Sequence, residues 1–330
     1  MPEEVTNMKY VNMGVIAALV FLNVPCAAQS QQNFPTKPIR LIAPWSSGTV
    51  VDIVARLVGQ KMSENWGRPV VVDNRPGAGG TVGAAIVAVA TPDGHTVMMQ
   101  AAAHAVHPTL YPKLSYDTLR DFAGVSQVAS GTVVLVIAPA QGIRSVKELI
   151  VLAKAKPGQI NFASGGIGSG THLNGEQFKF AAGINVVHIP YKAVSDTLVD
   201  VATSRVHYYF APLASALPFI RDKRLVPLAV STASRSPVLP DVPTVAEAAL
   251  PGFEFDLWYG LFVPAKTPRS IVDRLSKEVA RILNLPDIKE QMVNQGVVPK
   301  ASTPEQFDKF VRAEVEKLGK VIKAAGVKVE

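Results

Sequence analysis

The chain has 330 residues and a formal net charge of +7 at pH 7, with 48% hydrophobic and 18% charged residues. This composition suits a folded protein with enough interior for two ordinary domains, and the high apolar content argues against a disordered chain. The basic residues are scattered and are not interleaved with aromatic residues, which argues against nucleic-acid binding. The positive balance mildly favours an anionic ligand or surface, although it equally serves general solubility.

The N-terminus has the layout of a secretory signal peptide. Lys9 precedes an apolar run at 13–24, and small residues follow it, so that we expect cleavage after Ala28. The apolar run is too short for an ordinary transmembrane helix. Cys26 is the only cysteine of the chain and falls inside this segment, which predicts an exported protein without a disulfide once residues 1–28 are removed.

Beyond this segment, short apolar runs alternate with amphipathic helical patterns. The runs are continuously apolar, as in strands that are covered on both faces. The predicted strands are 39–43, 69–73, 95–100, 133–138, 160–163, 186–189, 206–210, 225–230 and 258–263. Apolar spacing predicts a helix over 50–64, and capping boxes at Ser145 and Thr303 predict two more that end near 156 and 325. The alternation indicates an α/β fold with mainly parallel sheets, and the number of strands indicates two domains.

The first candidate site is the turn "PWSSGTVVD", at 44–52, between a predicted strand and a predicted helix. The first amides of a helix have no intrahelical partner, and the helix dipole adds partial positive charge, so a carboxylate or phosphate suits this place. Ser46, Ser47 and Thr49 add hydroxyl groups, and Gly48 lets the backbone approach a ligand closely. An ordinary turn is the alternative, and Trp45 either covers a ligand or fills a packing gap.

The second candidate site is the glycine-rich stretch "SGGIGSGTH", at 164–172, which again follows a strand and opens a helix. Two such turns in the two halves of the chain could hold one anion from both sides, or both could be ordinary turns. His172 either contacts the ligand or only caps its helix. Lys192, after Tyr191, either complements an anion or is merely solvated.

Signals for other chemistry are incomplete. Gly77 and Gly79 fit the start of a dinucleotide-binding fingerprint, but the third glycine comes one position late. Ser169 does not lie in a G-x-S-x-G motif. His104 and His107 are three residues apart, but no nearby carboxylate or cysteine completes a metal site. We therefore expect no catalysis, no cofactor and no metal, and a secreted α/β hydrolase or isomerase is the rival from another class.

Several motifs resemble one family in collinear order. They include "FPTKPIRLIAPW", "VVVDNRPGAGGTVGA", "TPDGHTVMM", "GIGSGTHLNGEQFK" and "SRSPVLPDVPTVAEAALPGFEFDLWYGLFVPAKTP". On these motifs the chain resembles the Bug-type solute-binding receptors of tripartite tricarboxylate transporters. The resemblance implies a periplasmic-binding-protein type II (venus-flytrap) fold with a cleft between two domains. We expect 34–137 plus 254–330 to form domain I and 138–253 to form domain II.

The resemblance also implies a function. It implies a periplasmic, monomeric protein, which binds a small organic carboxylate between its lobes and delivers it to a membrane permease. A receptor that signals to a sensor is the alternative. The two turns and the resemblance together give the predicted ligand-binding residues: Trp45, Ser46, Ser47, Gly48, Thr49, Asp52, His104, Ser164, Ile167, Gly168, Ser169, Thr171, His172, Tyr191 and Ala211.

Some positions depart from the family pattern close to the expected site. Trp45 stands where phenylalanine is usual, and Thr49 replaces a glycine. Ala193 and Val194 replace a pair of glycines, and Ala211 stands where many members carry aspartate. Loss of that aspartate would remove a partner for a ligand amine, so we expect an amine-free carboxylate rather than an amino acid.

Overall fold

The computed structural model of the protein describes residues 34–191 and 193–327. The predicted signal peptide, at 1–28, and Lys192 lie outside the described residues. Within the described ranges, no helix has both the length and the apolar character that crossing a bilayer requires.

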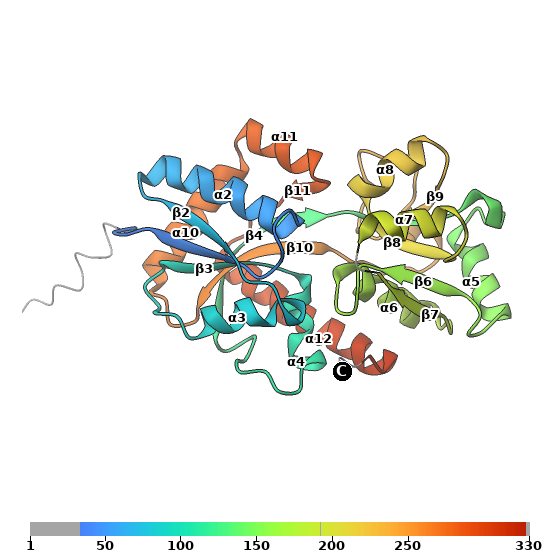
Figure 1. Cartoon of the computed structure of the whole chain (residues 1–330), viewed down its shortest axis with the longest axis horizontal. Coiled ribbons are helices and arrows are strands. Elements are labelled where there is room, and N and C mark those ends of the chain that lie inside the picture. The colour runs from blue at the N-terminus through green and yellow to red at the C-terminus, as the bar shows by residue number, and fades with distance from the viewer. Residues whose placement is uncertain (1–33, 192, 328–330) are drawn as a thin grey trace, which may run out of the picture.

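The described chain forms two sheets, one in each of two lobes (Figure 1). The first sheet has the strand order β11-β4-β10-β3-β1-β2, and the second has the order β7-β6-β8-β5-β9. The strands of the first sheet are β1 (Ile39–Ala43), β2 (Val70–Asn74), β3 (Thr96–Ala101), β4 (Phe122–Gly131), β10 (Leu257–Pro264) and β11 (Val297–Pro299). Those of the second are β5 (Val133–Ile137), β6 (Asn161–Ser164), β7 (Val187–Pro190), β8 (Tyr208–Pro212) and β9 (Val226–Val230).

The two-lobe α/β architecture is confirmed, and its sheets are mixed rather than mainly parallel. β1 runs parallel to β2 and β3, and β6 runs parallel to β7 and β8. The strands nearest the crossings between the lobes pair antiparallel, namely β10 with β3 and β4 and β5 with β8 and β9. The antiparallel pairs arise because β4 leads directly into β5 in the other sheet, while β10 returns beside β4.

Helices cover both faces of each sheet (Figure 1). In the first lobe, α2, α10 and α11 lie on one face, and α3, α4 and α12 lie on the other. In the second lobe, α7 and α8 lie on one face, and α5 and α6 lie on the other. The α-helices are α2 (Val50–Trp66), α3 (Thr81–Ala88), α4 (His107–Leu110), α5 (Val146–Ala155), α6 (Gly170–Ala182), α7 (Val194–Ala202), α8 (Leu213–Arg221), α9 (Val245–Ala248), α10 (Arg269–Leu283), α11 (Pro286–Asn294) and α12 (Pro304–Ala325). The short 3-10 helices are η2 (Ala78–Gly80), η3 (Ala102–Val106) and η4 (Pro139–Gln141).

Caps fix the helix ends that the sequence suggested. Thr303 accepts a hydrogen bond from the amide of Gln306, and the Gln306 side chain accepts one from the amide of Thr303, so the predicted capping box at α12 is confirmed. At α5 only half of the box forms. Ser145 caps the amide of Glu148, but the Glu148 side chain accepts from the amide of Arg144 instead.

The chain passes between the lobes at two described places. It crosses at Thr132, between β4 and β5, and returns between β9 and β10. β5, at 133–137, pairs in the second sheet, whereas the sequence suggested that domain II begins at residue 138. The side chain of Asp256 joins both crossings, because it accepts hydrogen bonds from the Ser130 hydroxyl and, at 3.0 Å, from the Lys300 ammonium group. Assignment of the two lobes as separate domains stays a proposal.

Helix α12 packs on β4 and η3 of the first lobe and reaches α6 of the second. Its close packing on the first sheet depends on Gly260, in the middle of β10. A Cβ atom at this glycine would lie 2.0 Å from Cζ of Phe307, a fully buried residue of α12. The missing side chain therefore lets the tip of the phenylalanine ring approach the backbone of β10.

We expect Gly260→Ala to lower the free energy of unfolding by about 1–3 kcal/mol, because the added methyl group would overlap the buried ring of Phe307. Chemical denaturation measures this change. Val89→Ala is the control, since Val89 is 83% exposed and its truncation is expected to change stability by less than about 0.5 kcal/mol. An alanine variant as stable as the wild type would contradict the close packing at β10.

Candidate ligand-binding site

A cavity of about 220 Å³ lies where α2 of the first lobe and α6 of the second lobe begin. Residues from both lobes line it: Trp45, Thr49, Val50, Val51, Ala101, Ala102, Ala103, Gly165, Ser169, Gly170, Thr171, Val194, Tyr209, Leu257 and Tyr259. The two turns that the sequence singled out therefore meet at one cavity. Its position at the carboxyl ends of β1 and β6 is the usual ligand position in open α/β sheets.

The first turn is organised by a buried carboxylate. Asp52 is 2% exposed and accepts hydrogen bonds of 2.9 Å from the amide of Gly48 and from the side chain of Asn74. Arg56 adds an ion pair, also at 2.9 Å. Burial opposes ionisation of Asp52, but the hydrogen bonds from Arg56, Gly48 and Asn74 outweigh it and lower its pKa to about 2. Asp52 thus stays charged and stabilises the turn. Its carboxylate accepts the hydrogen bond of the Gly48 amide, so this amide is not available to a ligand.

Trp45 is fixed at the edge of the cavity. Its indole N–H donates to the side-chain oxygen of Gln100 at 2.8 Å, and its carbonyl accepts from the side chain of Asn74 at 3.0 Å. Gln100 belongs to β3 and Asn74 to β2, the two strands that flank β1, so one strand fixes the ring and the other fixes the backbone of Trp45. The ring forms part of the wall and has no freedom to serve as a loose cover.

The free donors of the first turn are the first amides of α2. Thr49 occupies the cap position, but its hydroxyl donates to the carbonyl of Ser46 at 2.8 Å and does not cap the helix. Across the described residues, no group accepts a hydrogen bond from the amides of Val50 and Val51. Both residues line the cavity, so the positive end of a 17-residue helix faces it.

In the second turn, the amides of three glycines donate hydrogen bonds within the turn itself. The amide of Gly165 donates to the Thr171 hydroxyl at 2.9 Å, and that of Gly166 donates to the Ser164 hydroxyl at 3.1 Å. The amide of Gly168 donates to Nδ1 of His172 at 3.1 Å. The glycines thus shape the turn, and their amides are satisfied by the protein itself.

The free donors of the second turn again lie one step later, in the helix. The Ser169 hydroxyl caps α6 by accepting from the amide of His172 at 3.2 Å. Within the described chain, the amides of Gly170 and Thr171 have no acceptor, and both residues line the cavity. A Cβ atom at Gly170 would lie 2.0 Å from Leu257, so this glycine lets β10 approach the helix start.

His172 faces the interior of the second lobe. It is 1% exposed, and its ring stacks on His188 with a centroid distance of 4.0 Å. His188 in turn hydrogen-bonds the Ser164 hydroxyl at 2.6 Å. Burial lowers the pKa of His172 to about 3 and that of His188 to about 4, with smaller contributions from the charge of Lys179. A neutral His172 can accept a hydrogen bond from the Gly168 amide. The two histidines therefore stabilise the turn from the interior of the second lobe.

The predicted site residues fall into three groups. Trp45, Thr49, Ser169 and Thr171 line the cavity. The others lie in the same turns or behind them without lining it: Ser46, Ser47, Gly48, Asp52, Ser164, Ile167, Gly168 and His172. Ile167 is 49% exposed at the outer side of its turn.

Three predicted residues are engaged away from the cavity lining. The Tyr191 hydroxyl donates to Asp200 at 2.7 Å. His104 is fully buried among aromatic rings. The ring centroids of Phe122 and Phe262 each lie 5.0 Å from the ring centroid of His104. Ala211 is fully buried in β8 within the core of the second lobe.

Sequence reasoning did not identify the walls of the cavity. Ala101 ends β3, and Ala102 and Ala103 follow it; the end of β3 lies beside the end of β1, and the rule that ligands gather at strand ends could have found them. Val194, Tyr209, Leu257 and Tyr259 carried no motif signal, because they come from strands and a helix that meet only in the folded chain.

The cavity carries no charged side chain among the described residues that line it. The residues that line it contribute four backbone amides without partners in the described chain, the hydroxyls of Ser169 and Thr171, two tyrosines and apolar groups. Within the described residues, no cluster of three or more His, Cys, Asp or Glu could hold a metal ion. An anion in this cavity would therefore be held by neutral donors and by two helix dipoles.

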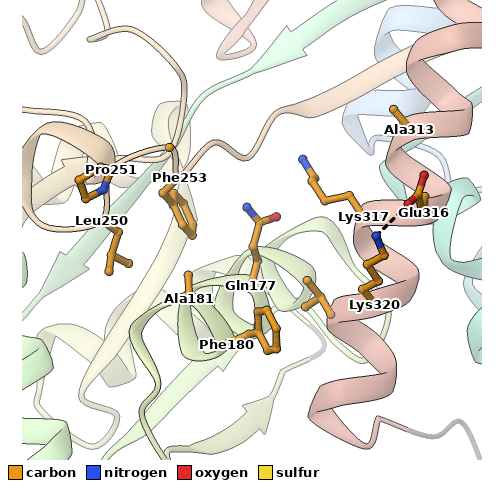
Figure 2. Close-up of a pocket in the computed structure, with 12 residues that line it drawn as sticks. Gln177, Phe180, Ala181, Leu250, Pro251, Phe253, Ala313, Glu316, Lys317 and Lys320 are labelled. Atoms are coloured by element: carbon orange, nitrogen blue, oxygen red, sulfur yellow. Dashed lines mark hydrogen bonds and ion pairs between the residues drawn. The ribbon is translucent and has the colours of Figure 1, made fainter.

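A larger hollow of about 700 Å³ lies between α6, the loop at 250–253 and α12 (Figure 2). It is a weaker candidate for an anion, because its lysines already have carboxylate partners. Lys320 pairs with Glu316 at 2.8 Å, and Lys317 pairs with Glu314 at 2.6 Å. Apolar residues such as Phe180 and Phe253 form much of the rest.

Comparison with known proteins supports the resemblance seen in the motifs. The family described as the tripartite tricarboxylate transporter family receptor matches residues 54–327. The chain is 37% identical over 306 residues to a UPF0065 protein of Pseudomonas sp. from the tcbD-tcbE intergenic region, which covers 92% of this chain and 91% of that protein. It is 31% identical over 320 residues to BugT of Bordetella pertussis, covering 96% of this chain and 97% of that protein.

Two solved structures are also similar. An R. palustris protein with adipate has a TM-score of 0.77 at 33% identity and covers 90% of this chain and 100% of its own. MatC from Rhodopseudomonas palustris with bound malate has a TM-score of 0.75 at 29% identity and covers 88% of this chain and 100% of its own.

We expect Asp52→Asn to lower the free energy of unfolding by about 2 kcal/mol at pH 7, as the shift of its pKa from 3.8 to about 2 implies. Because the pKa is lowered in the folded state, this stabilisation is present above pH 3.8 and is lost as the pH falls toward 2. Denaturation at several pH values measures the difference between wild type and variant. Asp287→Asn, at an exposed ion pair, is the control and should change little.

The buried histidine pair predicts loss of stability in mild acid. The pKa values of His172 and His188 are lowered on folding, so the unfolded chain binds more protons below pH 6.5. We expect the melting temperature to fall as the pH drops from 6.5 toward 4. The double variant His172→Asn with His188→Gln should flatten this fall between pH 6.5 and 5, and an equally steep fall would show that other groups cause it.

Proposed function

Because the chain belongs to the tripartite tricarboxylate transporter receptor family, we propose that it captures a small organic carboxylate between its lobes and delivers it to a membrane permease. The proposal includes export through the segment at 1–28 and a periplasmic location, as for the relative described as a periplasmic transporter. One chain supplies both sides of the cavity, which supports action as a monomer.

One observation carries the proposal. Two helices from opposite lobes begin at the same cavity, and each has two amides without a partner among the described residues: Val50 and Val51 in α2, and Gly170 and Thr171 in α6. The first amides of a helix have no intrahelical acceptor and attract an anion, so this arrangement favours an acceptor that comes from outside the chain. A carboxylate supplies up to four acceptor positions and a charge that both dipoles favour.

The ligands of the similar structures support this chemistry. Adipate and malate are both small carboxylates, and each was found with a protein of about the same length and fold as this chain. We propose the same class of ligand here. Which carboxylate fits depends on the walls of the cavity, which differ from the family pattern at Trp45, Thr49 and Val194.

We propose that the lobes close on the carboxylate by rotation at the two crossings. Contacts from both helix starts to one ligand form fully only when the lobes approach, so the ligand favours the closed state by the strength of those contacts. The anchor of Asp256 with Ser130 and Lys300 lies at the crossings and would keep the two strands together during the rotation.

We propose that the ligand leaves unchanged. The hydroxyls nearest the cavity already serve the fold: Ser169 caps α6, and Thr171 accepts the amide of Gly165. His172, the histidine closest to them in sequence, accepts a backbone amide at Nδ1, and its Nε2 lies 3.8 Å from Glu176, so neither ring nitrogen is bonded to either hydroxyl. A ligand-sensing role in place of transport shares the same binding step.

An amine-free carboxylate suits this cavity better than an amino acid. The reason given by the sequence was Ala211, but that residue lies in the core of the second lobe. The stronger reason is that no carboxylate among the described residues lines the cavity, so a bound ammonium group would lose its hydration without gaining a partner.

We expect calorimetry to show binding of adipate, malate or another amine-free carboxylate, with weaker or no binding of aspartate and glutamate. The carboxylate should be recovered unchanged after prolonged incubation. Stronger binding of the amino acids would contradict the amine-free assignment, and chemical conversion of the ligand would contradict the receptor function. Uptake by cells with and without the receptor gene separates transport from sensing.

We expect Val50→Pro to weaken carboxylate binding about tenfold or more, the effect of losing one hydrogen bond to a charged group. Proline is tolerated at the first position of a helix, where it removes only the amide hydrogen. Val50→Ala is the matched control, since it trims the same side chain and keeps the amide. Equal affinities of the two variants would show that the start of α2 does not hold the ligand.

A further inference from the structure

Two adjacent tyrosines of β8 point to opposite faces of the second sheet. Tyr208 packs with Phe178 and Phe210 in the core beside α6, whereas Tyr209 packs with the residues of α7 and α8 and also lines the ligand cavity. Both side chains are fully buried. The alternation of a strand thus places one tyrosine in the core and the other at the site.

Neither tyrosine hydroxyl has a hydrogen-bond partner within the described part of the chain. A buried hydroxyl without a partner lowers stability, and native proteins keep few of them. At Tyr208 the surroundings are core side chains. At Tyr209 the surroundings include a cavity, so a bound molecule can supply the missing acceptor.

The hydroxyl of Tyr209 is a proton donor at all ordinary pH values. Burial raises its pKa far above the usual range, and a side-chain interaction with Thr171, whose geometry falls short of a hydrogen bond, opposes this rise only in part. The same neighbour places the hydroxyl beside the start of α6, whose amides at Gly170 and Thr171 are free. A donor hydroxyl and two donor amides therefore converge on one end of the cavity.

We infer that Tyr209 is a specificity-determining residue, whose hydroxyl donates a hydrogen bond to a carboxylate oxygen of the ligand at the start of α6. The inference rests on the proposed function and assigns a role to a residue that carries no motif signal. It also fixes one end of the ligand at the second lobe. The apolar wall of Val194 and Leu257 then lies against the adjoining carbon atoms, which favours a carboxylate with an unsubstituted carbon beside the bound group.

The test compares Tyr209→Phe with Tyr208→Phe in the full-length mature protein. Both changes remove a buried hydroxyl without a partner and keep the ring, so neither should lower the melting temperature of the ligand-free protein. Calorimetry with adipate and with malate should then show about a tenfold weaker affinity for Tyr209→Phe, equal to about 1.4 kcal/mol, and no change for Tyr208→Phe.

The outcomes separate the two proposals. Binding of adipate or malate to the wild type with equal affinity for Tyr209→Phe overturns the role of Tyr209 and leaves the receptor function standing. Weaker binding together with a lower melting temperature, or an equal loss in both variants, assigns the tyrosine to the fold and also overturns the inference. A wild type that binds neither carboxylate overturns the proposed ligand class and the role of Tyr209 with it.

Discussion

Amide groups without partners at the starts of two helices govern the properties of this site. A helix normally finds a side chain to satisfy its first amides, and here the available hydroxyls are used elsewhere. Thr49 donates to Ser46, and Ser169 reaches the third residue of α6 but not the first two. Four donors from two lobes therefore face one cavity, because the hydrogen bonds within each turn leave these amides unpaired.

The charged and titratable groups close to the site act on the turns and not on the cavity. Asp52 binds the first turn through Gly48, Asn74 and Arg56, and the stacked histidines bind the second through Ser164 and Gly168. Their charges and protons are thus kept out of the ligand cavity. A lining of amides, hydroxyls and apolar groups binds an anion without a salt bridge, and such binding depends only weakly on the salt concentration.

The sequence was sufficient for the strand-turn-helix units, because each is local. The turns at 44–52 and 164–172 were found, and both reach the cavity. Which of their amides stay unpaired could not be predicted for residues such as Gly165 and Gly168, because a sequence does not show which amides the folded turn satisfies itself. β4 was missed because "FAGVSQVASG" is not continuously apolar, although it is central in its sheet. The tyrosines of β8 and β10 join the site only through the pairing of distant strands.

The segment that returns from the second lobe borders the ligand cavity and the hollow of Figure 2. Residues 250–253 line that hollow and Leu257 lines the cavity, while the carbonyl of Glu254 accepts hydrogen bonds from Gln177 of α6 and Lys317 of α12. In the proposed rotation of the lobes at this segment, the distance between α6 and α12 changes along with the width of the cavity. A wedge that fits only one width of the hollow in Figure 2, such as a nanobody loop, would then hold the receptor open or closed from outside.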